Sequence, residues 1–505
     1  MHFGSLVKEC TSFRLADRAS SSLEKLNTNL IFQPLDTLAD GRAGGIELSR
    51  RGVEATFFDD SYVTVNTLNP VHLIPSSGEI IPFHFGLLSS LSNKYTLSVV
   101  KLSCCKEDIL RKTPLLLAMM IIATGQVGVS IYLPSLPLVG HDLALPQHTV
   151  QNLVTLFLVG FGVSQLFYGP LSDAIGRRPV FLLGQSVYLV GTVICIGFAD
   201  HIVALEAGRL LQGLGAGSAS VLGRSVLRDS YDGAQLTKAL SYISVTASVM
   251  PIVAPLFGGW IAYHISWHAV FVFVLIYLAA IFTLGFVVLH ETLPYPKRRF
   301  EPKRVLLNYF ELLTNKQVIG SASYNWLSYL SALVTLSLYP FLMQQELGLT
   351  AADYGTLMIV PSAGLLMGSL VLNFINARYK EQQILLMSFV IVACSGAMLL
   401  ILPFTVASLL VAFTCLSFAQ GMSFPVSISL LLSPHKQQAG AVSALSGSIQ
   451  MCLAGLFGGY LVESWVTSQH QLGFFYISIA VISCLVLVFG QFRTPSGGLV
   501  QPERT

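Results

Sequence analysis

The residues of this sequence that are best suited to chemistry lie within otherwise apolar stretches. Glu206, Arg209 and Gln212 are spaced three apart, so on a helix they share one face. A charge inside an apolar helix is costly, faces the protein interior and by default has a function. The spacing therefore predicts a proton-coupling or substrate site on this face. The alternative is a Glu–Arg pair that only anchors the end of the helix.

Acidic groups that could take up a proton are scarce in the other apolar stretches. Gln126 is a polar residue of the first stretch, which has no Asp or Glu, and Asp353 and Glu463 lie at the edges of later ones. Burial of a carboxylate raises its pKa toward physiological values, which suits proton exchange. With so few acids, we expect neutral or weakly amphipathic substrates rather than cations.

Aromatic and flexible side chains could line an adaptable pocket for such substrates. The candidates are Tyr132, Tyr324, Trp326, Tyr329 and Met422. For each of them, the alternative interpretation is packing in the protein core or contact with lipid.

Two glycine-containing segments stand out beside these residues. Segment 169–179 reads GPLSDAIGRRP, in which the glycines permit a tight turn and the last proline suits the first turn of a helix. Its arginines can pair with Asp173 or with other acids, although an ordinary basic loop is the alternative. Segment 254–259 reads APLFGG, in which Pro255 removes a backbone hydrogen bond and the glycines permit close helix contact.

The composition identifies the apolar stretches as membrane spans. Of the 505 residues, 11% are charged and 53% are hydrophobic, and the mean hydropathy is +0.67. An average soluble protein is about 25% charged. The first 112 residues hold 24 charged side chains and the remaining 393 hold 31, so the polar part comes first. The net charge of +3 does not suggest a nucleic-acid-binding protein.

The apolar stretches have the length of transmembrane helices, which is about 20 residues. Twelve are present, over 114–134, 149–170, 179–198, 204–223, 238–262, 267–289, 317–341, 353–373, 384–402, 406–431, 439–462 and 471–491. Because a backbone in lipid must satisfy its own hydrogen bonds, helices are expected. The sequence therefore predicts an all-α polytopic membrane protein with twelve transmembrane helices.

The basic residues predict the orientation. Every second connection carries Lys or Arg, beginning with Arg111 and Lys112 and including Arg177 and Arg178, whereas the intervening connections have none. Since cytoplasmic loops carry the excess of Lys and Arg, both termini are predicted to be cytoplasmic.

An internal repeat divides the spans into two halves of six. The sequence LFGGW at 256–260 recurs as LFGGY at 456–460, and the basic turn at Arg177 has a counterpart at Arg378. Repeated six-span halves are a common plan of transporters. The predicted organisation is an N-terminal extension, a first bundle, a basic cytoplasmic linker, a second bundle and a cytoplasmic tail, over 1–112, 113–291, 292–316, 317–491 and 492–505.

Three of these segments resemble motifs of the major facilitator superfamily. Segment 169–178 is similar to the signature loop G-x-L-a-D-r-x-G-r-r/k, although Ala174 stands where the family has an arginine. Segment 209–217, RLLQGLGAG, resembles R-x-x-q-G-x-g-a, and segment 254–259 resembles the exporter motif, with Ala254 in place of a glycine. Segments 162–170 (GVSQLFYGP) and 290–294 (HETLP) resemble the Bcr/CflA group of drug–proton antiporters.

The resemblance implies a fold and site roles. It implies twelve helices in two halves and export of lipophilic drugs from the bacterial inner membrane at the expense of the proton gradient. In the family, residues matching Gly169, Asp173, Gly176, Arg177 and Arg178 form a cytoplasmic gating cluster, and the arginine matching Arg209 is associated with proton transfer. The segment matching Ala254, Pro255, Gly258 and Gly259 distinguishes exporters from importers.

Other activities lack their motifs. No G-x-x-x-x-G-K-[ST] and no H-E-x-x-H occurs, so neither ATP hydrolysis, enzymatic activity nor a metal site is expected, and protons would be the coupling ion. The protein is expected to act as a monomer in the bilayer. Residues 1–112 are not expected to hold a signal peptide and are expected to be disordered, or to reflect a start codon assigned too far upstream. A small regulatory domain and an amphipathic arm that contacts the membrane are the alternatives for this region. An importer of a small metabolite and a non-transporting membrane sensor are the alternative functions.

Overall fold

The computed structural model describes residues 115–231, 233–293 and 300–491. The predicted N-terminal extension, the predicted tail and part of the predicted linker lie outside these ranges. Most described residues are helical, and the described part contains no strand. The all-α class predicted from the apolar stretches is therefore confirmed.

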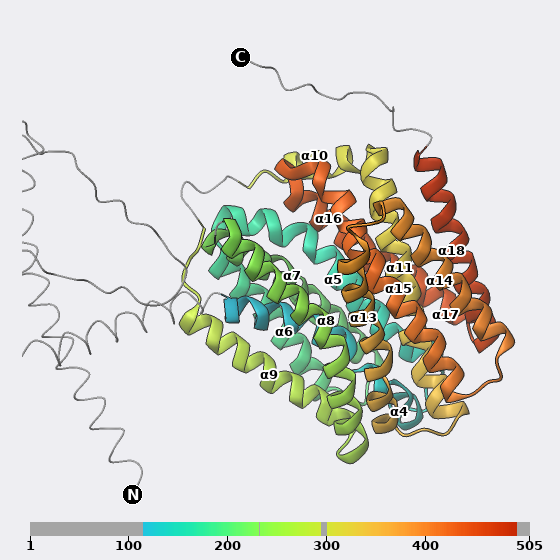
Figure 1. Ribbon diagram of the computed structural model, residues 1–505. Coiled ribbons are helices and arrows are strands. Elements are labelled where there is room, and N and C mark those ends of the chain that lie inside the picture. Colours follow the sequence, from blue (N-terminus) through green and yellow to red (C-terminus); the bar gives the residue numbers. More distant parts are fainter. Residues whose placement is uncertain (1–114, 232, 294–299, 492–505) are drawn as a thin grey trace, which may run out of the picture. The chain divides into compact units, whose positions relative to one another are not determined.

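Twelve helical runs of membrane-spanning length correspond to the twelve predicted stretches (Figure 1). They are the run over 115–130 continued by η1 (Leu133–Ser135) and α4 (Leu136–Asp142), then α5 (Gln147–Ile175), α6 (Arg177–Gly197), α7 (Ile202–Ser230), α8 (Gly233–His264), α9 (Trp267–Val288), α11 (Lys316–Phe341) with η2 (Leu342–Glu346), α12 (Ala351–Leu357) with α13 (Ile359–Ile375), α14 (Glu381–Ile401), α15 (Val406–Leu432), α16 (Ala439–Cys452) with η4 (Leu453–Phe457) and α17 (Gly458–Ser464), and α18 (Gln469–Gln491). A short turn, η3 (Ser433–Gln438), joins α15 to α16.

Ten runs in the described part are long and apolar enough to cross a membrane, which makes the chain a multi-pass membrane protein. The other two, α7 and α8, are 29 and 32 residues long. Helix α7 carries Glu206 and Arg209 within its length, which lowers its hydropathy, and the apolar part of α8 is Val249–His264. Helix α7 is therefore long enough to span a membrane, but its charged residues keep it out of the ten apolar runs.

Several elements differ in extent from the predictions. Helix α5 begins two residues before the predicted span at 149 and ends five after it at 170, because a helix can continue into the polar layer beyond the hydrocarbon. The predicted spans over 353–373 and 439–462 are interrupted at Met358 and by the π-helical turn η4. The predicted linker contains a further helix, α10 (Pro302–Thr314), which the sequence interpretation did not include.

The helices pack into two bundles that meet along two seams. In the first bundle α7 packs against α5 and α6, and α6 against α9; in the second, α15 packs against α11, α13 and α14, and α14 against α18. Between the bundles, α5 contacts α16 and α17, and α8 contacts α12 and α13.

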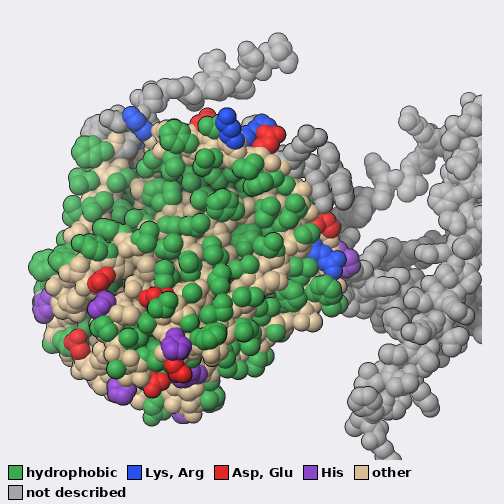
Figure 2. All heavy atoms as spheres, turned by 180° about the vertical axis from the view of Figure 1, so that it is seen from behind, with side chains coloured by type: hydrophobic (Ala, Val, Ile, Leu, Met, Phe, Trp, Pro, Cys, Tyr) green, Lys and Arg blue, Asp and Glu red, His purple; other side chains and the backbone are tan. Residues whose placement is uncertain are grey.

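The surface has the polarity expected of a membrane protein. On the face in Figure 2, hydrophobic side chains cover the middle of the body. Lys and Arg lie at its top and right margin, together with some acidic side chains, whereas the lower part of this face shows His and acidic side chains without Lys or Arg. This separation agrees with the alternation of basic and non-basic connections in the sequence.

Candidate functional site

Arg209 lies in the interior of the first bundle and joins three of its helices to the first span. The residue is 1% exposed. Its Nε donates to the carbonyl oxygen of Leu153 in α5 at 3.0 Å, and both terminal nitrogens point to that of Gly128 at 3.4 and 3.3 Å. Nη1 also donates to Oε1 of Gln212 at 2.9 Å, and Nε2 of Gln212 donates to Thr192 of α6 at 2.9 Å.

Aromatic rings, rather than carboxylates, surround this charge. The guanidinium carbon is 4.4 Å from the ring centroids of both Tyr132 and Phe157. Rings at this distance attract a cation, and the attraction grows when water is excluded. Among the described residues, both ion pairs involve Arg177 and none involves Arg209. The arginine is therefore a buried charge held by neutral acceptors and π-faces.

A small cavity adjoins Arg209. Its lining includes Tyr132, Ser135, Leu153 and Phe271 as well as the arginine. Its volume is about 10 Å³, roughly the room that one water molecule needs. The Tyr132 hydroxyl is buried and has no hydrogen-bond partner among the described atoms. Tyr132 thus borders a cavity the size of one water molecule, and its role in lining a substrate site stays a prediction.

The other polar candidates lie apart from this network. Glu206 and Gln126 are half-buried, and neither makes a hydrogen bond among the described residues. Asp353 is exposed and forms a capping box with Thr350 at the start of α12, where its carboxylate accepts from Thr350 Oγ1 at 2.6 Å. Glu463 is also exposed. No Asp or Glu in the described part is buried. The buried carboxylate that proton exchange would use is therefore not found among the described residues.

The predicted cytoplasmic turn forms a compact charge cluster. Arg177 begins α6 and pairs with Asp173 at 2.6 Å and with Asp229, at the end of α7, at 2.8 Å. Its backbone N–H donates to Oε1 of Glu291 at 2.8 Å. Gly176 has a φ of +117°, and a Cβ there would collide with the Glu291 carboxylate, so only glycine fits. Three segments of the first bundle are tied together at this point.

Asp229 and Glu291 were missed as site residues from the sequence. Both follow the ends of spans, and the sequence signal was limited to their places beside basic or proline-containing turns. Arg178, by contrast, lies outside the cluster: it donates to the carbonyl oxygen of Phe286 at 2.8 Å and lies 5.5 Å from the centroid of that ring.

The two acids that pair with Arg177 should contribute unequally. The Asp229 side chain is 12% exposed, whereas that of Asp173 is 44% exposed. Asp229→Asn should therefore cost about 2 kcal/mol of stability and Asp173→Asn less than about 1 kcal/mol, because a charged hydrogen bond loses value in water. Thermal unfolding of the purified variants measures both. Asp200→Asn, an exposed acid at the other end of α6, is the control; equal losses at 173 and 229 would contradict the ranking.

The segment that resembles the exporter motif lies at the seam between the bundles. Gly259 in α8 faces Ala351 and Gly355 of α12, and a Cβ on Gly259 would collide with the Ala351 carbonyl oxygen. A Cβ on Gly258 would collide with the carbonyl oxygen of Ile131. Ala254 and Pro255 are buried in the same helix. The glycines thus let three backbones approach one another closely.

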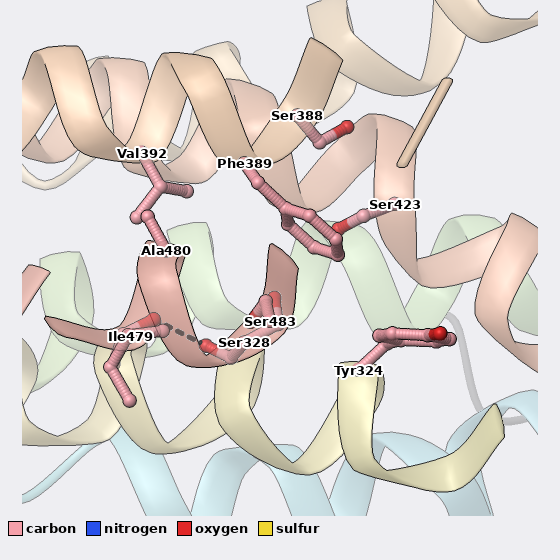
Figure 3. A pocket seen from close by; sticks show the side chains of 10 residues that line it. Tyr324, Ser328, Ser388, Phe389, Val392, Ser423, Ile479, Ala480 and Ser483 are labelled. Carbon is pink, nitrogen blue, oxygen red and sulfur yellow. Dashed lines mark hydrogen bonds between the residues drawn. The ribbon is translucent and has the colours of Figure 1, made fainter. Parts of the chain in front are cut away.

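The remaining aromatic candidates do not share one cavity. Tyr324 lines a second cavity of about 10 Å³, inside the second bundle, together with Phe389 and serines of α11, α14, α15 and α18 (Figure 3). The indole of Trp326 donates to the Ser446 carbonyl oxygen at 3.0 Å, and Tyr329 packs at the edge of a large hydrophobic cluster that draws on both bundles. These two line neither cavity.

The architecture is that of a secondary transporter. Two six-helix bundles meet at two seams, and the first bundle holds the buried side chain of Arg209. The match to known proteins makes the class specific: the chain belongs to the Major Facilitator Superfamily, which residues 115–459 match.

Similar proteins include multidrug resistance proteins. Multidrug resistance protein D of Escherichia coli is 30% identical over 370 residues, which cover 71% of this chain and 91% of that protein. Multidrug resistance protein MdtL of Escherichia coli is 26% identical over 363 residues, which cover 72% of this chain and 91% of MdtL.

Solved structures share the fold at low identity. A variant of the nucleoside transporter NupG has a TM-score of 0.60 at 13% identity, covering 76% of this chain and all of that chain. The human organic anion transporter MFSD10 has a TM-score of 0.55 at 15% identity, covering 75% of this chain and 99% of that chain.

Proposed function

We propose that this protein exports lipophilic compounds across the bacterial inner membrane in exchange for protons. The similarity to the two multidrug resistance proteins over nine-tenths of their lengths carries this proposal. We infer further that both termini are cytoplasmic and that the protein acts as a monomer. It uses neither ATP nor another cofactor, is not an enzyme and binds no nucleic acid.

Export, rather than import, is inferred from α8, because its segment 254–259 resembles the motif that distinguishes exporters in the family. In the proposed cycle the two bundles rock about a central site, and the glycines of α8 seal the periplasmic side when they meet α12. Further contacts support this seal: Nε2 of Gln151 donates to the Ser337 carbonyl oxygen, and Nε2 of Gln344 to that of Pro134, both at 2.9 Å. These bonds must break when the periplasmic side opens.

Uncharged compounds are the proposed substrate class. A cationic drug needs a buried carboxylate to offset its desolvation, and no described acid is buried. The contacts that cross between the bundles near α5 and α11 come instead from neutral amides such as Gln151 and Gln344. Such groups offer hydrogen bonds to a neutral substrate without requiring its charge.

Glu206 is the proposed proton carrier. It lies one helical turn before Arg209 and is half-buried, so its carboxylate can meet both water and the edge of the arginine site. Glu206→Gln is expected to lower proton-driven efflux at least about tenfold while leaving substrate binding in place, because the amide cannot release a proton. Efflux rates and binding of the same dye to purified protein separate the two effects; full efflux by this variant would remove Glu206 from the mechanism.

The proposed function is tested by dye efflux from cells that express the protein, with and without a protonophore. We expect efflux that stops when the proton gradient collapses. Efflux that continues would contradict the antiport, and gradient-driven uptake of a single nutrient would favour an importer. A protein that binds a ligand but shows no flux in proteoliposomes would be a sensor.

A further inference from the structure

Helix α10 presents three different faces. Taking 100° per residue, Val305, Tyr309 and Leu312 fall on one side, and the structure buries Tyr309 and Leu312 there against residues of α11 and α16. Arg304, Asn308 and Glu311 form a polar side. Between them lies an apolar side that the protein leaves uncovered.

The uncovered apolar side is large for so short a helix. Its four members are exposed by 70%, 59%, 66% and 40%, and they are Leu306, Leu307, Phe310 and Leu313. Water is an unfavourable neighbour for four such side chains on one face, since each would gain by burial. Lys303 lies on the same side but in the first turn, where its long stem can extend to water.

The position of α10 places this face at the membrane surface. Only Asn315 separates it from Lys316, where the spanning helix α11 begins. The Asn315 carboxamide oxygen accepts from the backbone N–H groups of Gln317 and Val318 at 2.9 and 3.4 Å, which fixes the corner between the two helices. The C-terminal end of α10 therefore lies at the level at which α11 enters the bilayer.

The buried face of α10 contacts both bundles. The Tyr309 hydroxyl donates to the carbonyl oxygen of Leu166 in α5 at 3.0 Å, while Leu312 packs in a cluster that includes Val318 and Leu445 of the second bundle. Burial raises the pKa of Tyr309 to about 12, so the hydroxyl keeps its proton at any physiological pH. Nearby, Gln165 of α5 lies against Gly447 of α16, at the seam between the bundles.

We propose that α10 lies in the headgroup layer of the lipid bilayer, with Leu306, Leu307, Phe310 and Leu313 inserted, and that the bilayer thereby holds Tyr309 against α5 as a latch across the seam. The partner is the phospholipid surface itself. An amphipathic helix of this kind inserts its apolar side and keeps its polar side in water. Lys303, Arg304 and Lys316 outnumber Glu301 and Glu311 by one, so apolar insertion rather than charge is the main attraction.

The test compares two cysteines on the same helix. Leu307→Cys lies on the apolar side and Glu311→Cys on the polar side, and both positions are exposed when no bilayer is present. The full chain is purified, reconstituted in phosphatidylcholine vesicles and reacted with a membrane-impermeant maleimide, with the unsubstituted chain as background. We expect Leu307→Cys to react at least about tenfold more slowly than Glu311→Cys, because only its side is covered by lipid.

Two further variants decide what protects position 307. Replacing Leu306 and Phe310 by Ser should bring the Leu307→Cys rate close to that of Glu311→Cys, whereas Tyr309→Phe should leave the ratio unchanged. Equal rates at 307 and 311 in the parent would overturn the proposal. So would protection that survives loss of both apolar neighbours, since it would come from the protein. Monodisperse elution of each variant confirms that it is folded.

Discussion

Arg209→Met is expected to abolish efflux while leaving the protein as stable as the unsubstituted chain. The two halves of this expectation come from the same observation: Arg209 is 1% exposed, and the partners of its guanidinium are carbonyls, an amide and two rings. Removing one member of a buried ion pair costs stability because the other charge is left alone. Here no charged partner is left, and methionine fills a similar volume with apolar atoms.

The loss of efflux follows from the charge itself. A buried cation can bind a developing negative charge or favour deprotonation of a nearby acid only while it is present. Arg209→Lys keeps the charge but loses the planar fork that reaches Leu153, Gly128 and Gln212 together, so we expect this variant to lose most of its efflux too.

The measurements are dye efflux at equal expression and thermal unfolding of purified protein. Arg228→Met is the matched control, because Arg228 is on the same helix but exposed, and no hydrogen bond or ion pair of its side chain is found among the described residues. The control should transport normally. An Arg209→Met protein that still exports dye would remove the arginine from the mechanism, and one that fails to fold would show that its role is structural.

The sequence predicted the spans and the burial of Arg209 because both depend on local chemistry. An apolar run of about 20 residues can only be satisfied in lipid or in a core, and a charge within it must turn inward. The partners of Arg209 could not be predicted. The acceptors at Leu153 and Gly128 are backbone carbonyls, which every residue has, and only tertiary packing selects these two.

Only part of the charge cluster around Arg177 could be predicted from the sequence, for a related reason. Asp173 and Arg177 are four apart in one turn, so their pairing is local. Asp229 is 52 residues and Glu291 is 114 residues from Arg177, and they join it only because α7 and the end of the last span of the bundle reach the same corner. Glu206 shows the limit of helix periodicity: three residues turn a helix by about 300°, so it lies some 60° from Arg209 and remains half-buried.

Gly259→Val is expected to disrupt the seam between α8 and α12 and to shift the protein toward the state in which that side is open. A Cβ at this position collides with the carbonyl oxygen of Ala351, which is backbone and cannot rotate away. Overpacking of this kind costs about 1–3 kcal/mol. Because the contact joins two bundles that can separate, the cost falls on the closed state rather than on folding, and about 2 kcal/mol changes the ratio of two states roughly thirtyfold.

Accessibility measures this shift directly. Ser135→Cys places a thiol in η1, where the native residue is 3% exposed. In the Gly259→Val background it should react with an impermeant maleimide at least about tenfold faster than in the parent, in line with the change in population. Gly320→Ala and Gly197→Ala are the controls, since a Cβ at either position meets no atom within 4 Å. Unchanged labelling together with a normal efflux rate would mean that α8 and α12 tolerate separation in the closed state, and the seam would then not be the seal. Increased labelling with lost efflux would show that export requires closure at the Gly259 contact. A transporter that cannot close this side would leak whenever its cytoplasmic side opened.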